Sequence, residues 1–132
     1  MSSTIGHVIL SVSDFRKSEA FYDPLMLAMG FRIGLRERAR DGGVKSYHSG
    51  SHTLFLKWKK DRKHRPFSRD VGLDHLAFNV KNKSSVDKLF RLAEAGGCRI
   101  TVPPKAYPGY SKRYYAFYFR DPDGIPLEIA AY

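Results

Sequence analysis

The sequence predicts an α+β fold built from two copies of a βαβββ module, with strands in a cupped mixed sheet and helices on its outer face. Two observations predict it. The segment His7–Val12 resembles His75–Val80 at an offset of 75 − 7 = 68, which indicates an internal repeat. After each copy comes an amphipathic stretch that ends at glycine, and then segments with apolar residues at every second position.

The 132 residues suit one domain, since two independent cores need a longer chain. We expect a single domain over 1–132, with module one at about 5–58, a linker at about 59–71 and module two at about 72–131.

Module one is expected to start with a strand over His7–Val12. A helix follows over about Phe15–Met29, and Pro24 is expected to kink it. Three further strands are predicted near 31–37, 44–49 and 52–58.

Module two repeats this order. Its helix is predicted over about Ser85–Ala95, and Ser84 with Asp87 resembles a helix N-cap pair. Its strands are predicted near 75–80, 98–102, 114–120 and 125–131. The sequence Asp121-Pro122-Asp123-Gly124 is typical of the tight turn between the last two strands.

Strand alternation separates a core face from a polar face. The core face of the two repeated strands is apolar throughout, and it carries Val8, Leu10, Val12, Leu76, Phe78 and Val80. His7, His75 and Glu128 fall on the opposite faces. Imidazole and carboxylate bind Fe, Mn, Ni, Co or Zn and leave positions open for substrate. Each residue alone also suits an ordinary strand position, but the repeated histidine pair together with Glu128 favours metal ligands.

The charge favours anionic partners. Twenty-three Lys and Arg against 13 Asp and Glu give a net charge of +10. The run 57–70 has seven basic and two acidic residues, which is typical of a solvated linker and less often of an anion-binding segment. Nucleic acid is not expected as a partner, because only Trp58 and Phe67 supply aromatic rings in that run.

No stretch approaches the ~18 uncharged apolar residues of a membrane span, so no membrane partner is expected. The single cysteine, Cys98, and the absence of a signal-peptide pattern predict a cytoplasmic protein.

Three segments resemble the vicinal oxygen chelate superfamily, which includes glyoxalase I, bleomycin-resistance proteins, fosfomycin-resistance thiol transferases and extradiol dioxygenases. Tyr114–Glu128 is similar to its aromatic strand, DPDG turn and terminal ligand glutamate, and Gly72–Phe78 to its second ligand strand. His7 matches the first ligand. The resemblance implies βαβββ modules around a divalent metal (Fe, Mn, Ni, Co or Zn) held by His7, His75 and Glu128. It also implies a homodimer with site residues drawn from both subunits.

The chain departs from glyoxalase I at one position. That enzyme takes a fourth ligand, a glutamate, from the last strand of module one, and the repeat puts Phe55 there. A phenyl ring neither binds metal nor acts as a base, so glyoxalase I activity is not expected. Bleomycin is cationic, so a chain of net charge +10 is a poor candidate for its sequestration.

The sequence therefore predicts a metal-dependent lyase, transferase or dioxygenase, glyoxalase-like or dioxygenase-like, acting on a small anionic or metal-chelating substrate. The residues expected to bind substrate are Tyr118, Phe55, Trp58 and Arg120, and no catalytic acid or base is assigned. The alternative is a metal-free protein that sequesters a small molecule in the same fold. The loop 103–113 is expected to be a rigid connector, with a lid over the site as the other reading.

Overall fold

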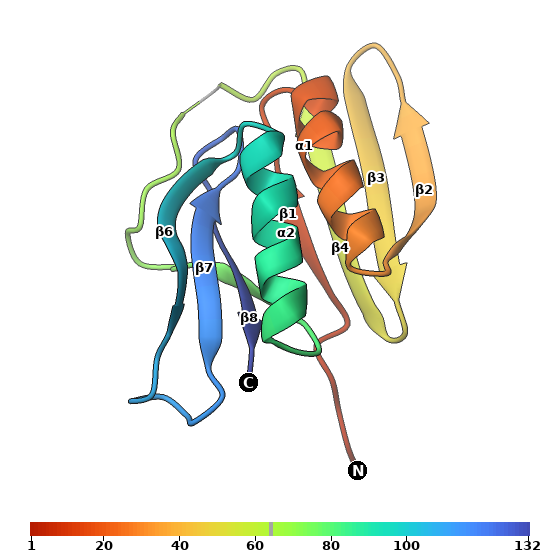
Figure 1. Ribbon diagram of the computed structural model, residues 1–132. Coiled ribbons are helices and arrows are strands. Elements are labelled where there is room, and N and C mark those ends of the chain that lie inside the picture. Colours follow the sequence, from red (N-terminus) through yellow and green to blue (C-terminus); the bar gives the residue numbers. More distant parts are fainter. Residues whose placement is uncertain (64) are drawn as a thin grey trace. The chain divides into compact units, whose positions relative to one another are not determined.

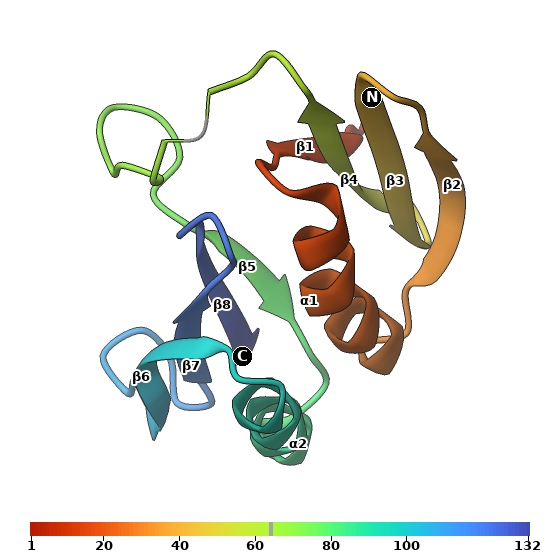
Figure 2. The same ribbon diagram turned by 90° about the horizontal axis from the view of Figure 1, so that it is seen from above.

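A computed structural model describes residues 1–63 and 65–132. The chain divides into two compact units, Met1–Arg65 and Pro66–Tyr132. Each unit has one long helix lying along one face of its own four-stranded mixed sheet (Figures 1 and 2). The predicted α+β class with paired βαβββ modules is confirmed.

The first unit follows the predicted element order. Its elements are β1 (His7–Ser11), α1 (Phe15–Ala28), β2 (Arg32–Arg38), β3 (Gly42–Ser49) and β4 (His52–Lys59). The sheet order is β1-β4-β3-β2, with β1 parallel to β4 and the other pairs antiparallel.

The second unit repeats that topology. Its elements are β5 (Leu76–Asn79), α2 (Lys83–Ala95), β6 (Arg99–Ala106), β7 (Tyr115–Arg120) and β8 (Pro126–Ala131). The order is β5-β8-β7-β6, and β5 is parallel to β8. The matching topology shows that the sequence repeat marks a structural repeat.

Helix α1 begins and ends at local signals in the sequence. The Asp14 carboxylate accepts a hydrogen bond from the Lys17 amide at 3.0 Å, and Gly30 adopts φ 88° just after the helix. Pro24 lies inside the helix, which continues through it to Ala28 as one element. The buried side of the helix carries Phe15, Ser18, Tyr22, Leu25 and Met26.

Helix α2 starts earlier than predicted. Asn82, not Ser84, is its N-cap, because the Asn82 side chain accepts hydrogen bonds from the Ser85 amide at 2.9 Å and from the Ser85 hydroxyl at 3.0 Å. The pairing of Ser84 with Asp87 was therefore the wrong capping assignment. Asp87 instead accepts a hydrogen bond from the Tyr115 hydroxyl at 2.7 Å, which ties α2 to β7.

Strand β6 is longer than predicted, since it runs to Ala106 and includes Pro103 and Pro104. Proline fits there because β6 is an edge strand, where the missing N–H costs no ladder bond on the open side. The segment 103–113 is thus part strand and part hairpin tip. The Tyr107 amide donates to the Tyr114 carbonyl at 2.8 Å, which closes the tip and makes it a connector between strands.

The turn before β8 forms as the sequence indicates. The Asp121 carboxylate accepts hydrogen bonds from the amides of Asp123 and Ile125 at 2.9 and 2.8 Å, and Gly124 takes φ 83°. Leu127 and Ile129 beyond the turn are buried in the core of the second unit. No helix in the described residues is long and apolar enough to cross a membrane.

Candidate functional site

His75 and Glu128 come together in the second unit. Ala77 pairs with Glu128 between β5 and β8, and His75 lies two residues before Ala77, so alternation brings His75 to the same face. The His75 Nε2 atom is 2.9 Å from the Glu128 Oε2 atom. Glu128 is only 1% exposed, so its carboxylate depends on neighbouring side chains for hydrogen bonds.

Two tyrosines of the aromatic strand accompany this pair. The Tyr114 hydroxyl donates a hydrogen bond to Glu128 Oε1 at 2.5 Å. Tyr118 lies directly opposite Glu128 in the β7–β8 register, and its ring centre is 6.0 Å from that of His75. Burial and the negative charge of Glu128 raise the pKa of Tyr118 to about 12, and they raise the pKa of Tyr114 as well. Both phenols therefore keep their protons at neutral pH.

Asp74 contacts the second nitrogen of the His75 imidazole. Its Oδ1 atom is 2.6 Å from His75 Nδ1, and this hydrogen bond lowers the pKa of the Asp74 carboxyl. The arrangement is the one in which a metal-binding histidine offers Nε2 to an ion and donates Nδ1–H to a carboxylate. Asp74 and Tyr114 were not predicted as site residues. Two features of the sequence could have identified them: Asp74 is adjacent to His75, and Tyr114 has the same strand parity as Tyr118.

His7, the third predicted ligand, lies in the first unit at the start of β1, where it is exposed. Its ring packs edge-on against Phe55 at 5.6 Å between ring centres. Across residues 1–63 and 65–132, no three His, Cys, Asp or Glu side chains are placed to hold one ion. The structure thus joins His75 to Glu128 and places His7 in the other unit.

Phe55 occupies in the first unit the position that Glu128 occupies in the second. Phe55 pairs with Ile9, two residues after His7, and Glu128 pairs with Ala77, two residues after His75. The phenyl ring therefore stands where the second unit has a carboxylate.

The remaining two predicted substrate contacts lie elsewhere. Trp58 shares strand parity with the buried Leu56, so it lies on the opposite side of the sheet from Phe55. Arg120 donates from Nη1 to the Gly124 carbonyl at 2.8 Å, so its guanidinium is engaged with the tight turn.

A second histidine, which sequence reasoning missed, shares a face with His7. Thr53 pairs with His7 on one side and with His48 on the other, so the three residues form one row across the first sheet. His48 Nε2 lies 2.8 Å from Ser46 Oγ and its Nδ1 lies 3.1 Å from Thr53 Oγ1. Gly34 leaves the space for this ring, because a Cβ there would lie 2.3 Å from His48 Nε2.

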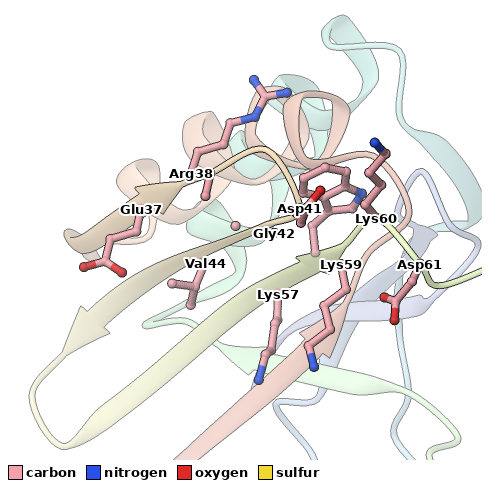
Figure 3. Close-up of a pocket in the computed structure, with 12 residues that line it drawn as sticks. Glu37, Arg38, Asp41, Gly42, Val44, Lys57, Lys59, Lys60 and Asp61 are labelled. Atoms are coloured by element: carbon pink, nitrogen blue, oxygen red, sulfur yellow. The ribbon is translucent and has the colours of Figure 1, made fainter.

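The first unit also contains a pocket of about 910 Å³ at the ends of β2, β3 and β4 (Figure 3). Arg38, Lys57, Lys59 and Lys60 line it, together with the acids Glu37, Asp41 and Asp61. Trp58, Val44, Ala39 and two glycines complete its wall. The pocket combines both signs of charge with apolar surface.

Two βαβββ units, with polar side chains on their sheet faces and a hydrogen-bonded pair of His75 and buried Glu128 in the second unit, define the class of protein. The model of the Glyoxalase/Bleomycin resistance protein/Dioxygenase superfamily matches residues 4–129. The chain belongs to this superfamily.

Relatives and solved structures are similar over nearly the whole chain. Protein YwkD of Bacillus subtilis (strain 168) is 35% identical, with 96% of this chain and 94% of YwkD covered. Glutathione transferase FosA of Serratia marcescens is 28% identical over 98% of this chain and 81% of FosA. A glyoxylase/bleomycin resistance protein/dioxygenase domain from Frankia sp. EAN1pec has a TM-score of 0.81 at 25% identity, with 99% and 98% of the two chains covered.

Proposed function

We propose that the protein is a divalent-metal-dependent enzyme of this superfamily, with His7, His75 and Glu128 as metal ligands and a small anionic or metal-chelating molecule as substrate. The observation that carries the proposal is the approach of His75 Nε2 to the buried Glu128 carboxylate at 2.9 Å. Fe, Mn, Ni, Co and Zn all accept such nitrogen and oxygen donors.

The donor set fits a metal in three respects. An imidazole nitrogen and a carboxylate oxygen already lie side by side, and Asp74 engages the far nitrogen of the imidazole at 2.6 Å. Tyr114 fixes the second oxygen of Glu128. Lewis acidity toward substrate oxygens is the chemistry that such a metal supplies when bound.

Residues around the pair suit an anionic substrate. Tyr118 keeps its proton at neutral pH because its pKa is raised to about 12, so its phenol can donate a hydrogen bond to an anionic oxygen. The net charge of +10 attracts such molecules over longer distances. FosA, a glutathione transferase, supports a reaction of the transferase kind, alongside the lyase and dioxygenase reactions.

Elemental analysis tests the metal site. Protein purified without chelator is expected to carry metal, or to take up about one Mn, Ni, Co, Fe or Zn per chain after addition. His75→Ala should lose this uptake, whereas His52→Ala, which changes an exposed histidine of β4, should retain it. Sub-stoichiometric metal in the unchanged protein after every addition would overturn the proposal.

A second candidate function is a metal-free protein that sequesters a small molecule. One observation favours it: both oxygens of Glu128 are already hydrogen-bonded, one to His75 and one to Tyr114. This candidate predicts ligand binding that is indifferent to EDTA, whereas the enzyme loses activity with its metal.

We further propose a homodimer in the cytoplasm, with each site completed between subunits. Light scattering measures the mass of the protein in solution and so tests for the dimer. Mixing His7→Ala with His75→Ala protein under conditions of subunit exchange should restore metal uptake at one of the two sites of a mixed dimer. Absence of any restoration in confirmed mixed dimers would show that each site belongs to one chain.

A further inference from the structure

On one face of the first sheet, the chemical type of the side chains changes from one end of the strands to the other. Helix α1 covers the other face, because its Asp23 contacts Lys45 and Tyr47 of β3. Alternation then assigns Val44, Ser46 and His48 to the face away from α1, and their register partners on the neighbouring strands lie on it too. We call this the open face of the first sheet.

At one end of the open face lies the row His7, Thr53 and His48. The next row consists of Ile9, Phe55 and Ser46, and it is largely apolar. Ile9 is 49% exposed, so its side chain is available for contact with a ligand. An apolar surface of this kind contacts the hydrocarbon part of a ligand.

The other end of the open face is cationic. Its next row runs from Ser11 through Lys57 and Val44 to Glu37, and Lys59 follows beside Gly42. Figure 3 shows Lys57 and Lys59 extending to the same side of the sheet as Val44, while Arg38 and Lys60 extend to the other. Arg62 donates a hydrogen bond from Nη1 to Ser11 Oγ, which adds a third cation to this end.

Two of the three acids of the pocket accompany these cations on the open face, whereas the third, Asp41, precedes Gly42 and alternates to the other side. Glu37 stands two strands away from Lys57, on the edge strand β2, and Asp61 follows β4. Lys57, Lys59 and Arg62 outnumber these two carboxylates, and Lys57 lies two residues from Phe55 on β4 while Arg62 contacts Ser11 of β1. The potential at this end therefore favours an anion.

The distance between the two ends sets the length of the ligand. Thr53 and Lys57 are four residues apart on β4, which corresponds to about 13 Å at the rise of a β-strand. A ligand that uses both ends must carry polar groups separated by a similar length of apolar chain or ring.

We propose that the open face binds an elongated anion, with an acidic group between Lys57 and Lys59, an apolar middle over Ile9 and Phe55, and a second oxygen-bearing group toward His7. The placement of that second group rests on the proposed metal site. The anion-binding end stands on the geometry of the first unit alone, and it narrows the substrate class to long molecules with an acidic terminus.

Dodecanedioate is a suitable probe, because its extended chain separates two carboxylates by a length similar to that between the rows. Isothermal titration calorimetry in EDTA should show saturable binding of dodecanedioate. Succinate and 1,12-diaminododecane should bind far more weakly, the first because it is short and the second because it is a cation.

The double variant Lys57→Gln/Lys59→Gln should raise the half-saturating dodecanedioate concentration about tenfold, the effect of losing hydrogen bonds to a charged group. The double variant Arg38→Gln/Lys60→Gln removes the same charge from the opposite side of the sheet and should change it less than twofold. Circular dichroism checks that each variant is folded. Equal weakening by Arg38→Gln/Lys60→Gln, or tight binding by Lys57→Gln/Lys59→Gln, would overturn the inference.

The experiments distinguish failure of the proposed metal site from failure of the proposed anion site. If metal uptake is absent but dodecanedioate binds in EDTA and depends on Lys57 and Lys59, the anion site stands and the metal site falls. If metal binds normally and Lys57→Gln/Lys59→Gln binds the probe like the unchanged protein, only the anion site falls. A change in the mass of Lys57→Gln/Lys59→Gln in solution without the probe would show that a second copy covers this face, and it would also overturn the inference.

Discussion

The Glu128 carboxylate is fixed by two side chains, one just before β5 and one just before β7. His75 reaches one oxygen at 2.9 Å and the Tyr114 hydroxyl reaches the other at 2.5 Å, in a place where Glu128 is 1% exposed. Partners of this kind orient a ligand before a metal arrives. In the proposed metal site, Tyr114 would therefore be a positioning residue for Glu128 and not itself a ligand.

Tyr114→Phe should lower the affinity for divalent metal by about ten- to a hundredfold, since it frees one oxygen of Glu128. Competition with a chromogenic chelator measures this affinity. Tyr110→Phe is the matched control, because Tyr110 is an exposed ring of the same hairpin that stacks on Tyr107. Unchanged affinity in Tyr114→Phe would show that the hydrogen bond does not position the ligand.

Ser18 is a polar residue in a fully buried position. It is 0% exposed on the inner side of α1, and its hydroxyl has no hydrogen-bond partner among the described residues. Ser18→Ala should therefore increase the free energy of unfolding by about 1 kcal/mol, because it removes a buried polar atom and improves helix propensity. Urea unfolding measures the difference. Ser84→Ala on the exposed start of α2 should change it by less than about 0.5 kcal/mol, and a destabilised Ser18→Ala would contradict the argument.

Strand parity was sufficient to predict which side chains share a face with His75 and Glu128. It was not sufficient to predict the contacts, because a hydrogen bond depends on the rotamers of both partners. Tyr114 and Tyr118 have the same parity, yet the sequence singled out only Tyr118. His48 was missed for a related reason: its place depends on the space that Gly34 leaves on a neighbouring strand, and local sequence does not show such cross-strand packing.

Helix α1 is joined to its sheet by charge as well as by apolar packing. Lys45 is only 3% exposed, and its ammonium lies 3.2 Å from Glu19 and 2.8 Å from Asp23. Arg36 on β2 also contacts Glu19, and the Tyr47 hydroxyl donates to Asp23 at 2.6 Å. The group links one helix to two strands, and removing one partner leaves an opposite charge poorly compensated.

Glu19→Gln should make the stability of the protein less sensitive to acid. The hydrogen bond from Arg36 lowers the pKa of Glu19 in the folded state, and Lys45 acts in the same direction. Its contribution is therefore fully present above its unfolded pKa of about 4.3, and it is lost as the pH falls through the lower folded pKa. Urea unfolding between pH 6 and pH 2.5 measures this slope. Glu94→Gln on the exposed side of α2 is the control, and equal slopes for Glu19→Gln and the unchanged protein would contradict the prediction.

Elements were predicted well where a signal is local, and less well at their ends. The Asp121–Gly124 turn and the glycines after both helices were read correctly, since positive φ values need glycine there. The start of α2 was misplaced because Asn82 and Ser84 are both good N-caps, and the choice depends on where the chain leaves β5. The predicted end of strand β6 was too early because two prolines normally argue against a strand. Only the edge position of β6 makes them acceptable.

At the scale of the whole chain, the repeat predicted two modules within one domain, because each copy has its own helix and its own apolar strand face. Buried residues confirm a core in each unit, with Leu54, Leu56 and Met26 in the first and Phe117, Leu127 and Ile129 in the second. The division falls between Arg65 and Pro66, within the basic run at 57–70. The segment that joins the units is therefore the one with the highest density of positive charge.

This charge predicts where the chain is cut first. Arg62, Lys63 and Arg69 are exposed, lie outside the strands and helices, and are trypsin sites, whereas the bond after Arg65 precedes Pro66 and resists trypsin. Limited trypsin digestion should therefore cleave first between residues 59 and 70, and give two fragments of nearly equal length that mass spectrometry identifies.

A matched comparison is a second exposed basic segment, Lys112 and Arg113 at the β6–β7 hairpin tip. Cleavage there should be slower, because the Tyr107–Tyr114 hydrogen bond closes a short tip that must open before a protease can bind it in an extended form. Adding an anion that occupies Lys57 and Lys59 should slow the first cut near residue 59 and leave the hairpin cut unchanged. First cleavage at the hairpin would show that the segment between the units is better protected than its exposure and composition indicate.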